Sequence, residues 1–482
     1  MRRFVRNLFS VYAVNVLNGA LGVIFVPVAI AWLGKAGYGL FSIYSVLVGC
    51  LALADLGMGK NLARLLASDR SEETQRESLQ IALALYVCFS AALLILLPLL
   101  LALVADTLFP VPVEQRAAVK WITAIAVLEY CLAVPTGLTQ TFTIATERFD
   151  RYARFVFVSG LYRYGLLFLG ILVFHSPVPV VGLVAARRLA DLFVARRLMG
   201  NLPRGSWRPR FCTRSMREML AGSAVLSLAQ TLQTAMLTLA SVLVNRYFGI
   251  AGLGIYRSGF DLASKVWFFS NGLGLVVFPR FASLLAGETN RPQLLARLRA
   301  FMRASWAGYN LLAAVGVLAA PVLMRAFKRG DEAIVALFVL LLLGVSINAH
   351  ANVGYEFVLA SARYRLAVFA CGLALVSMVV CFFLLRGMTG ILAVGWAWIV
   401  SQALYAGLVD GSAAFEGMLW SPLQFRLLAF KALILALSIA AVGAYLGLLP
   451  SAFRLAALAF LMLFFFGSAR RAQAVLAMPR LE

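Results

Sequence analysis

Long apolar blocks recur along almost the whole chain, and they constrain its fold more than any other feature. The hydrocarbon core of a membrane is about 30 Å thick and needs roughly 20 apolar residues per helix. Blocks of that length return repeatedly between Leu8 and Phe466 and lack the strict alternation of a membrane β-barrel. Only 13% of the 482 residues are charged, too few to cover a soluble protein of this size. We therefore predict an all-α polytopic membrane protein.

The apolar blocks predict about 14 transmembrane helices, with 12 as the alternative if the last two blocks form something else. The predicted helices lie near residues 8–33, 38–66, 79–105, 117–146, 152–174, 178–199, 215–247, 252–279, 298–327, 332–361, 364–386, 391–410, 424–448 and 453–471.

The charged residues between these helices predict their orientation. A net charge of +23 would suggest nucleic acid in a soluble protein, but here the basic residues gather in alternate loops. Cytosolic loops of membrane proteins carry such an excess of Lys and Arg. The richer side includes Arg2 and Arg3, the group from Arg148 to Arg154, and the dense run from Arg187 to Arg217. We predict that both termini are cytosolic and that no nucleic acid is bound.

One constant offset in residue number, that from Gly34 to Gly249, relates two halves of the chain. It carries the glycines of Trp32–Gly39 onto those of Tyr247–Gly254. The glycines are Gly34, Gly37 and Gly39 in the first copy, and Gly249, Gly252 and Gly254 in the second. We predict that they close a tight turn between two helices in each copy.

The same offset carries Arg148 onto Arg363, beyond the turn motif. Six helices then form one unit, and an even number gives both copies the same orientation in the membrane. We predict an N-terminal lobe (1–199), a cytosolic basic linker (200–214) and a C-terminal lobe (215–410). Residues 411–482 supply two extra helices and a cytosolic tail.

Polar residues line one face of the predicted helix 215–247, and the first helix carries a shorter version. Such a stripe must face protein or water within a membrane. The candidates for contact with a substrate are Asn15, Asn18, Gln230, Gln233 and Thr234. Two interpretations remain open: a cavity wall, or helix packing through small and amide side chains.

Arg257, Asp261 and Lys265 recur every four residues and form one charged face of a predicted helix. Charges inside a membrane are costly unless they are paired or hydrated. Asp261 can pair with either cation, and the remaining positive charge suits an anionic ligand. The alternative is an internal salt bridge with an arginine at the outer end of the helix.

Four further ionisable residues fall within apolar blocks. They are Glu129, Arg163, His350 and Glu356. Arg163 extends toward the membrane surface in one interpretation and into a cavity in the other. His350 is either a packed, hydrogen-bonded histidine or a proton carrier.

The motifs of several enzyme classes are absent from the sequence. It has no GxxxxGK[ST] phosphate loop, HExxH or GxSxG, and none of the six cysteines forms a CxxC pair. We expect no ATP site, no metal and no cofactor apart from a coupling ion, H⁺ or Na⁺.

Three short motifs resemble those of the polysaccharide transport family, within the multidrug/oligosaccharidyl-lipid/polysaccharide exporter superfamily. They are Leu33–Gly39, Asp55–Gly57 and the stretch from Gly252 that ends at Arg280. The resemblance implies two six-helix lobes around a cationic cavity. It also implies alternating access that flips undecaprenyl-pyrophosphate-linked sugars. Lipid II flippases in this superfamily have two extra C-terminal helices, like the last pair predicted here.

The resemblance and the charges together predict a flippase of the bacterial inner membrane, a transporter and not an enzyme. Its expected cargo is a lipid-linked oligosaccharide, such as an O-antigen, capsule or exopolysaccharide unit. Its expected partners are membrane lipids, and a polysaccharide polymerase and glycosyltransferases. A cation-coupled multidrug or metabolite antiporter of the same fold and a membrane glycan polymerase are the alternatives.

Overall fold

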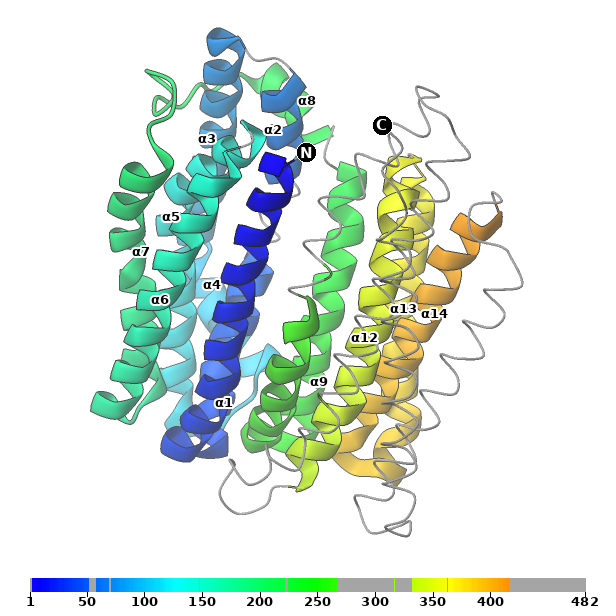
Figure 1. Cartoon of the computed structure of the whole chain (residues 1–482). Coiled ribbons are helices and arrows are strands. Elements are labelled where there is room, and N and C mark those ends of the chain that lie inside the picture. The colour runs from blue at the N-terminus through cyan, green and yellow to red at the C-terminus, as the bar shows by residue number, and fades with distance from the viewer. Residues whose placement is uncertain are drawn as a thin grey trace. The chain divides into compact units, whose positions relative to one another are not determined.

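The computed structural model describes residues 2–51, 58–68, 71–146, 148–221, 224–267, 270, 316, 332–361 and 363–415. All regular structure within these ranges is helical (Figure 1). The chain divides into two compact units, Met1–Arg257 and Ser258–Glu482. The predicted all-α class is therefore confirmed for the described part of the chain.

The first unit contains most of the described helices. They are α1 (Arg2–Leu51), α2 (Met58–Ser68), α3 (Glu72–Ile95), α4 (Leu97–Ala102), a π-helix (Leu103–Leu108), α5 (Val113–Ala145), α6 (Phe149–Phe174), α7 (Pro177–Met199), α8 (Thr213–Ala221) and α9 (Ala224–Ala263), whose last residues enter the second unit.

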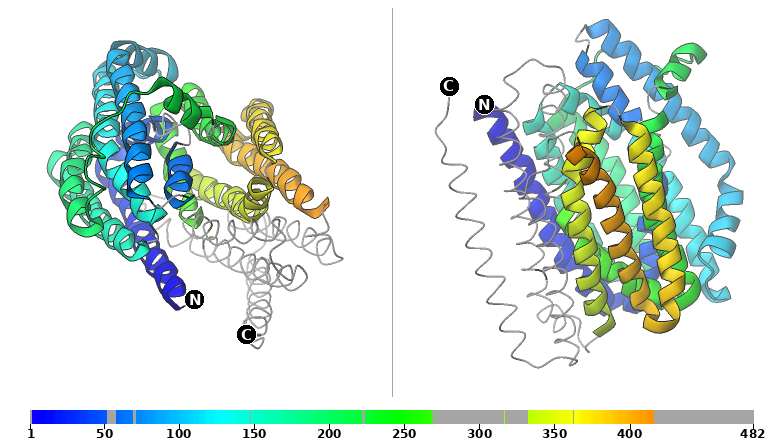
Figure 2. Two further views of the ribbon diagram at one scale, coloured as in Figure 1. Left: turned by 90° about the horizontal axis from the view of Figure 1, so that it is seen from above. Right: turned by 90° about the vertical axis from the view of Figure 1, so that its right-hand side faces the viewer.

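The second unit continues with a 3₁₀ turn (Ser264–Val266), α12 (Glu332–Ala360), α13 (Tyr364–Thr389), a second 3₁₀ turn (Gly390–Leu392) and α14 (Ala393–Phe415). Helix α14 packs against both α12 and α13. Helices α13, in yellow, and α14, in orange, lie side by side (Figure 2). Trp398 of α14 is buried in this unit, with its ring edge-to-face against Phe260.

Seven helical segments of the described residues are long and apolar enough to cross a membrane. They are Val16–Leu51, Glu72–Ile95, Val113–Ala145, Phe149–Phe174, Leu228–Val266, Ala333–Leu359 and Tyr364–Asp410. The chain is therefore a multi-pass membrane protein. The total of 14 stays a prediction. Helix α7, predicted as a span near 178–199, is not among the seven segments. The blocks near 424–448 and 453–471, and all of 298–327 except residue 316, lie outside the described residues.

Two glycines break long helices with almost the same backbone angles. Gly34 in α1 has φ 70° and ψ 175°, and Gly249 in α9 has φ 68° and ψ −177°. A side chain would be strained at such a positive φ, which explains why glycine stands there. Each long helix therefore breaks at the first glycine of its motif. The other four motif glycines have no positive φ and lie in helix.

Gly39 and Gly254 serve close packing within the first unit. A Cβ atom at Gly39 would overlap the carbonyl oxygen of Ile250, and one at Gly254 would overlap that of Lys35. Lys35 and Ile250 are themselves related by the offset that relates Gly34 to Gly249. The two contacts are therefore copies of one another, and helices α1 and α9 cross at a distance that only glycine permits.

The offset also recurs where α6 and α13 begin. Both helices have 26 residues, and their N-terminal neighbours Arg148 and Arg363 share φ near −86° and ψ near 50°. The Arg148 amide donates to the carbonyl of Thr143 over 3.0 Å, and the Arg363 amide donates to that of Val358 over 3.0 Å. The duplication is thus visible in backbone geometry, whereas the predicted lobe boundaries stay a prediction.

Candidate functional site

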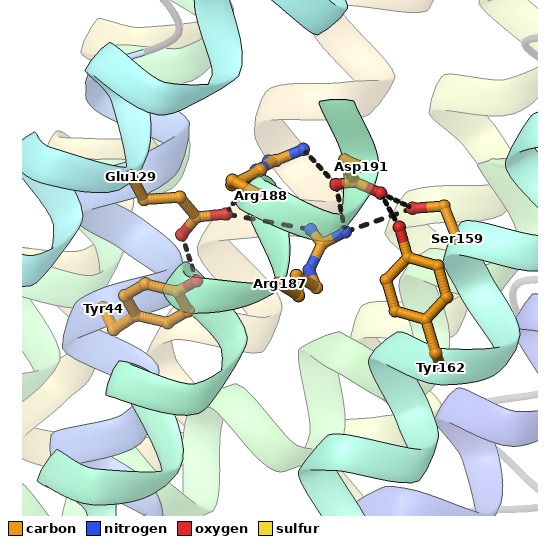
Figure 3. A network of polar contacts seen from close by, with 7 residues as sticks. All are labelled: Tyr44, Glu129, Ser159, Tyr162, Arg187, Arg188 and Asp191. Atoms are coloured by element: carbon orange, nitrogen blue, oxygen red, sulfur yellow. Dashed lines mark hydrogen bonds and ion pairs between the residues drawn. The ribbon is translucent and has the colours of Figure 1, made fainter. Parts of the chain in front are cut away.

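A buried polar network joins four helices of the first unit (Figure 3). Its members are Tyr44 from α1, Glu129 from α5, Ser159 and Tyr162 from α6, and Arg187, Arg188 and Asp191 from α7. Three of them lie on α7, where positions three and four apart share one face of the helix.

Asp191 is the centre of one side of this network. Its side chain is 0% exposed. Its carboxylate accepts hydrogen bonds from Ser159 Oγ over 2.7 Å and from Arg187 over 3.0 Å, and a third from the Tyr162 hydroxyl. Such a number of donors offsets the cost of burying a carboxylate.

Glu129 is the centre of the other side. It is 1% exposed and accepts a 2.9 Å hydrogen bond from Arg188 Nε and another from the Tyr44 hydroxyl. Arg187 lies 3.7 Å from the same carboxylate and so bridges both acidic residues. The Nε of Arg187 is buried and has no hydrogen-bond partner among the described residues.

The charges of this region do not cancel. Two arginines and two carboxylates balance within the network, but Arg163 of α6 is close enough to Arg187 and Tyr44 to act on both electrostatically. Arg163 is exposed, whereas Arg187 is buried. Three cations thus face two carboxylates, and the excess charge favours an anion nearby.

Sequence reasoning missed most of this network. It assigned Arg187 to a basic cytosolic run, but the structure buries that residue as the eleventh of α7, about 15 Å along the helix axis. The spacing of Arg187 and Asp191 was the available signal, because positions i and i+4 share a helix face and charges within an apolar helix require a partner. Of the predicted site residues, only Glu129 belongs to the network.

The network has no charged counterpart in the second copy. At the offset of the repeat, Glu129 corresponds to Gly344, Arg187 to Gln402 and Asp191 to Ala406. A Cβ atom at Gly344 would overlap the ring of Trp398, so packed indole replaces the glutamate. The two halves have therefore kept the backbone plan and diverged in their buried charge.

The predicted polar stripe is only partly described. Asn18 lies against α6, where a Cβ atom at Gly160 would overlap its side chain, and this contact fits the packing interpretation. The side chain of Asn15 lies outside the described part. Gln230, Gln233 and Thr234 are partly buried on α9.

The remaining predicted residues fall on α9 and in the second unit. Arg257 is buried, with 8% exposed, near the end of α9. Asp261 is partly buried in the last turn of α9, and Lys265 is partly buried in the 3₁₀ turn that follows. His350 is 4% exposed and Glu356 is partly buried, both on α12. Their roles in binding stay predictions.

The described residues contain no group of three or more His, Cys, Asp or Glu side chains able to hold a metal ion.

Comparison with known proteins gives one family and a set of solved structures. The family model described as "Polysaccharide biosynthesis protein" matches residues 4–285, more than half of the chain. No curated protein sequence matches significantly.

The solved structures share the fold at low sequence identity. The lipid II flippase MurJ, in an inward closed conformation, has a TM-score of 0.65 at 13% identity, over 95% of this chain and 97% of its own. An inward-facing multidrug resistance MATE transporter of the MOP superfamily has 0.63 at 15% identity, over 85% and 95%. A MOP superfamily transporter from Pyrococcus furiosus has 0.65 at 15% identity, over 86% and 96%.

Proposed function

The chain belongs to the polysaccharide biosynthesis protein family, and we propose that it flips a lipid-linked oligosaccharide across the bacterial inner membrane. The proposed cargo is an undecaprenyl-pyrophosphate-linked unit of O-antigen, capsule or exopolysaccharide. The observation that carries the proposal is the family match over residues 4–285. The solved structures with this fold are transporters and flippases.

The extent of the structural likeness supports a flippase over a drug transporter. The lipid II flippase aligns with 95% of this chain, whereas the MATE transporter aligns with 85%. The sequence predicts two helices beyond the twelve of the paired lobes. The alignment with the lipid II flippase covers more of this chain, which agrees with the two extra helices.

The charge of the first unit supports an anionic cargo. A pyrophosphate group is best held by arginine, whose planar guanidinium donates two parallel hydrogen bonds to phosphate oxygens. Arg163 is exposed beside the buried Arg187 and adds the charge that the two carboxylates do not balance. We assign Arg163, with Arg257 and Lys265, to the pyrophosphate, and the amides and hydroxyls of α9 to the sugar.

The proposed mechanism is alternating access driven by the membrane potential or by an H⁺ or Na⁺ gradient. Buried Arg187 holds Glu129 and Asp191 together, so the network fixes α5 against α7. A rigid bundle of this kind moves as one body when a transporter changes its facing state. Glycosyltransferases on the cytosolic side and a polymerase on the far side are the proposed partners.

Export of a surface glycan in a strain that lacks the chromosomal gene tests this function. We expect Arg163→Ala to reduce export at least tenfold and Arg163→Lys to restore part of it, because lysine keeps the charge but not the paired hydrogen bonds. Arg154→Ala is the matched control, since Arg154 is an exposed arginine of the same helix. Normal export in both Arg163→Ala and Lys265→Ala would exclude the proposal that these cations hold the pyrophosphate.

A cation-coupled antiporter is the second candidate, because MATE transporters share the fold, one of them with a TM-score of 0.64. It requires acidic residues that are open to a cationic drug, whereas Glu129 and Asp191 are already paired with arginine. Drug resistance conferred on an efflux-deficient host, together with normal glycan export in the deletion strain, would favour this candidate.

A further inference from the structure

The segment from Arg196 to Arg217, here called the basic segment, is unusually rich in arginine. It runs from the last turn of α7 through the connecting loop into the start of α8. It contains Arg196, Arg197, Arg204, Arg208, Arg210, Arg214 and Arg217. No Asp or Glu occurs between Leu192 and Arg217. All seven side chains are exposed. The segment lies at the same end of the first unit as the start of α1 (Figure 1).

Two of these arginines form ion pairs, one with another helix and one within α8. Arg210 pairs with Glu77 of α3, and Arg214 pairs with Glu218 of α8 over 3.1 Å. The other five form no ion pair with a described acidic residue. The basic segment therefore carries an excess of about five positive charges, which creates a strong local potential.

The backbone of the basic segment is held in place by α3. Gln80 donates from Nε2 to the carbonyl of Gly205 over 2.9 Å, and its backbone carbonyl accepts from the Arg210 amide over 3.2 Å. Leu202 is buried in an apolar cluster that also contains Leu79 of α3. The arginines are thus presented from a fixed surface, which lowers the entropy cost of binding a ligand.

Two large aromatic side chains stand exposed among the arginines. Trp207 is 41% exposed and Phe211 is 61% exposed. A soluble surface gains nothing from these groups, whereas the boundary between lipid and water favours tryptophan and other aromatic rings beside cations. This combination distinguishes the segment from an ordinary basic loop.

We infer that the basic segment is a binding surface for anionic phospholipids of the cytosolic leaflet. Its arginines outside the two ion pairs contact the phosphate groups, while Trp207 and Phe211 insert at the level of the headgroups. Charge complementarity selects this ligand, since anionic lipid attracts each Lys or Arg near the membrane surface. The segment begins in the last turn of α7. The inference is independent of the cargo proposed above, because it concerns the surrounding lipid and not the transported molecule.

The experiment uses the full-length protein in nanodiscs made from phosphatidylcholine with or without phosphatidylglycerol. Mass spectrometry of the intact complexes measures how much phosphatidylglycerol stays bound. We expect enrichment of phosphatidylglycerol that falls as salt rises. Arg204→Gln combined with Arg208→Gln should weaken its retention about 30-fold, from the loss of two cations near an anionic surface.

Two further double variants complete the design. Trp207→Ser with Phe211→Ser should also reduce retention, because the rings no longer insert. Arg116→Gln with Lys120→Gln changes net charge equally at the start of α5 and should have no effect. All these positions are on the surface, and a single symmetric peak in size-exclusion chromatography confirms folding of each variant.

Three results would overturn the inference. One is unchanged phosphatidylglycerol retention in the variant of Arg204 and Arg208. Another is an equal loss in the α5 control, which would indicate general charge attraction. The third is normal phosphatidylglycerol retention in the variant of Trp207 and Phe211. That result would show that charge alone binds the lipid, as on a surface for a soluble acidic partner.

Discussion

Asp191 is the residue on which the buried network most depends, because four side chains donate to its carboxylate or pair with it. We expect Asp191→Asn to lower stability by about 3–5 kcal/mol, since it leaves Arg187 buried without its closest counter-charge. The thermal unfolding midpoint of the purified protein in detergent measures this loss.

Asp150→Asn is the control for that substitution. Asp150 lies in the first turn of α6, is about half exposed and pairs with Arg154 at 4.0 Å. Exposed ion pairs contribute at most about 1 kcal/mol, so this change should hardly move the midpoint. Equal shifts in the two variants would show that the buried network is not the source of the stability.

Cys212 offers a second test at the scale of single residues. It lies beside the start of α8, where the Ser215 hydroxyl donates to its sulfur over 3.5 Å. Hydrogen bonds from Ser215, with the charge of Arg210, lower the pKa of the Cys212 thiol below its usual range. A lower pKa leaves more thiolate at a given pH, and the thiolate is the reactive form.

We therefore expect alkylation of a variant with Cys212 as its single cysteine to persist at lower pH than alkylation of a free thiol. Ser215→Ala removes the donor and should shift the pH profile of the rate toward higher pH. If Ser215→Ala left the pH profile of alkylation unchanged, the hydrogen bonds from Ser215 would not be the cause of the lowered pKa.

At the scale of helices, the glycine motifs serve two distinct purposes. Gly34 and Gly249 allow a turn that other residues strain to adopt, whereas Gly39 and Gly254 allow two backbones to touch. Sequence reasoning assigned all six motif glycines to the turn. The packing role needs a partner from the other copy of the repeat, so it was not visible in the local sequence.

We expect Gly39→Ala and Gly254→Ala each to lower the thermal unfolding midpoint, since the new methyl group meets a backbone carbonyl that cannot move aside. Gly49→Ala is the matched control, because no atom lies within 4 Å of a Cβ at that position. Alanine is also the better helix former, so this control should be neutral or slightly stabilising. Equal midpoints for all three variants would refute the close crossing of α1 and α9.

At the scale of the whole molecule, the duplicated backbone carries unequal chemistry. The start of α6 and the start of α13 have matching angles and hydrogen bonds. The charged network of the first copy is replaced in the second by Gly344, Gln402 and Ala406. Backbone geometry is preserved because packing requires it, while the buried charges are specific to one half and mark it for a distinct role.

The predicted orientation is a property of the whole chain, and thiol labelling in intact cells measures it. Cys212 lies on the predicted cytosolic side, and the exposed position of Glu114 at the start of α5 lies on the opposite side. With all other cysteines replaced, a membrane-impermeant maleimide should label Glu114→Cys directly. It should label Cys212 only after the membrane is permeabilised. The reverse pattern would invert the assigned topology.

The sequence by itself determined the membrane fold, the constant offset between the two copies and the turns at Gly34 and Gly249. These features follow from local or repeated constraints: a helix must satisfy its own backbone in lipid, and a positive φ requires glycine. Only the tertiary structure decided which charges meet. Tyr44 and Glu129 are 85 residues apart, and Arg188 contacts Glu129 across 59 residues. A buried ion pair depends on the geometry of several helices at once, so its partners are fixed by packing and not by spacing along the chain.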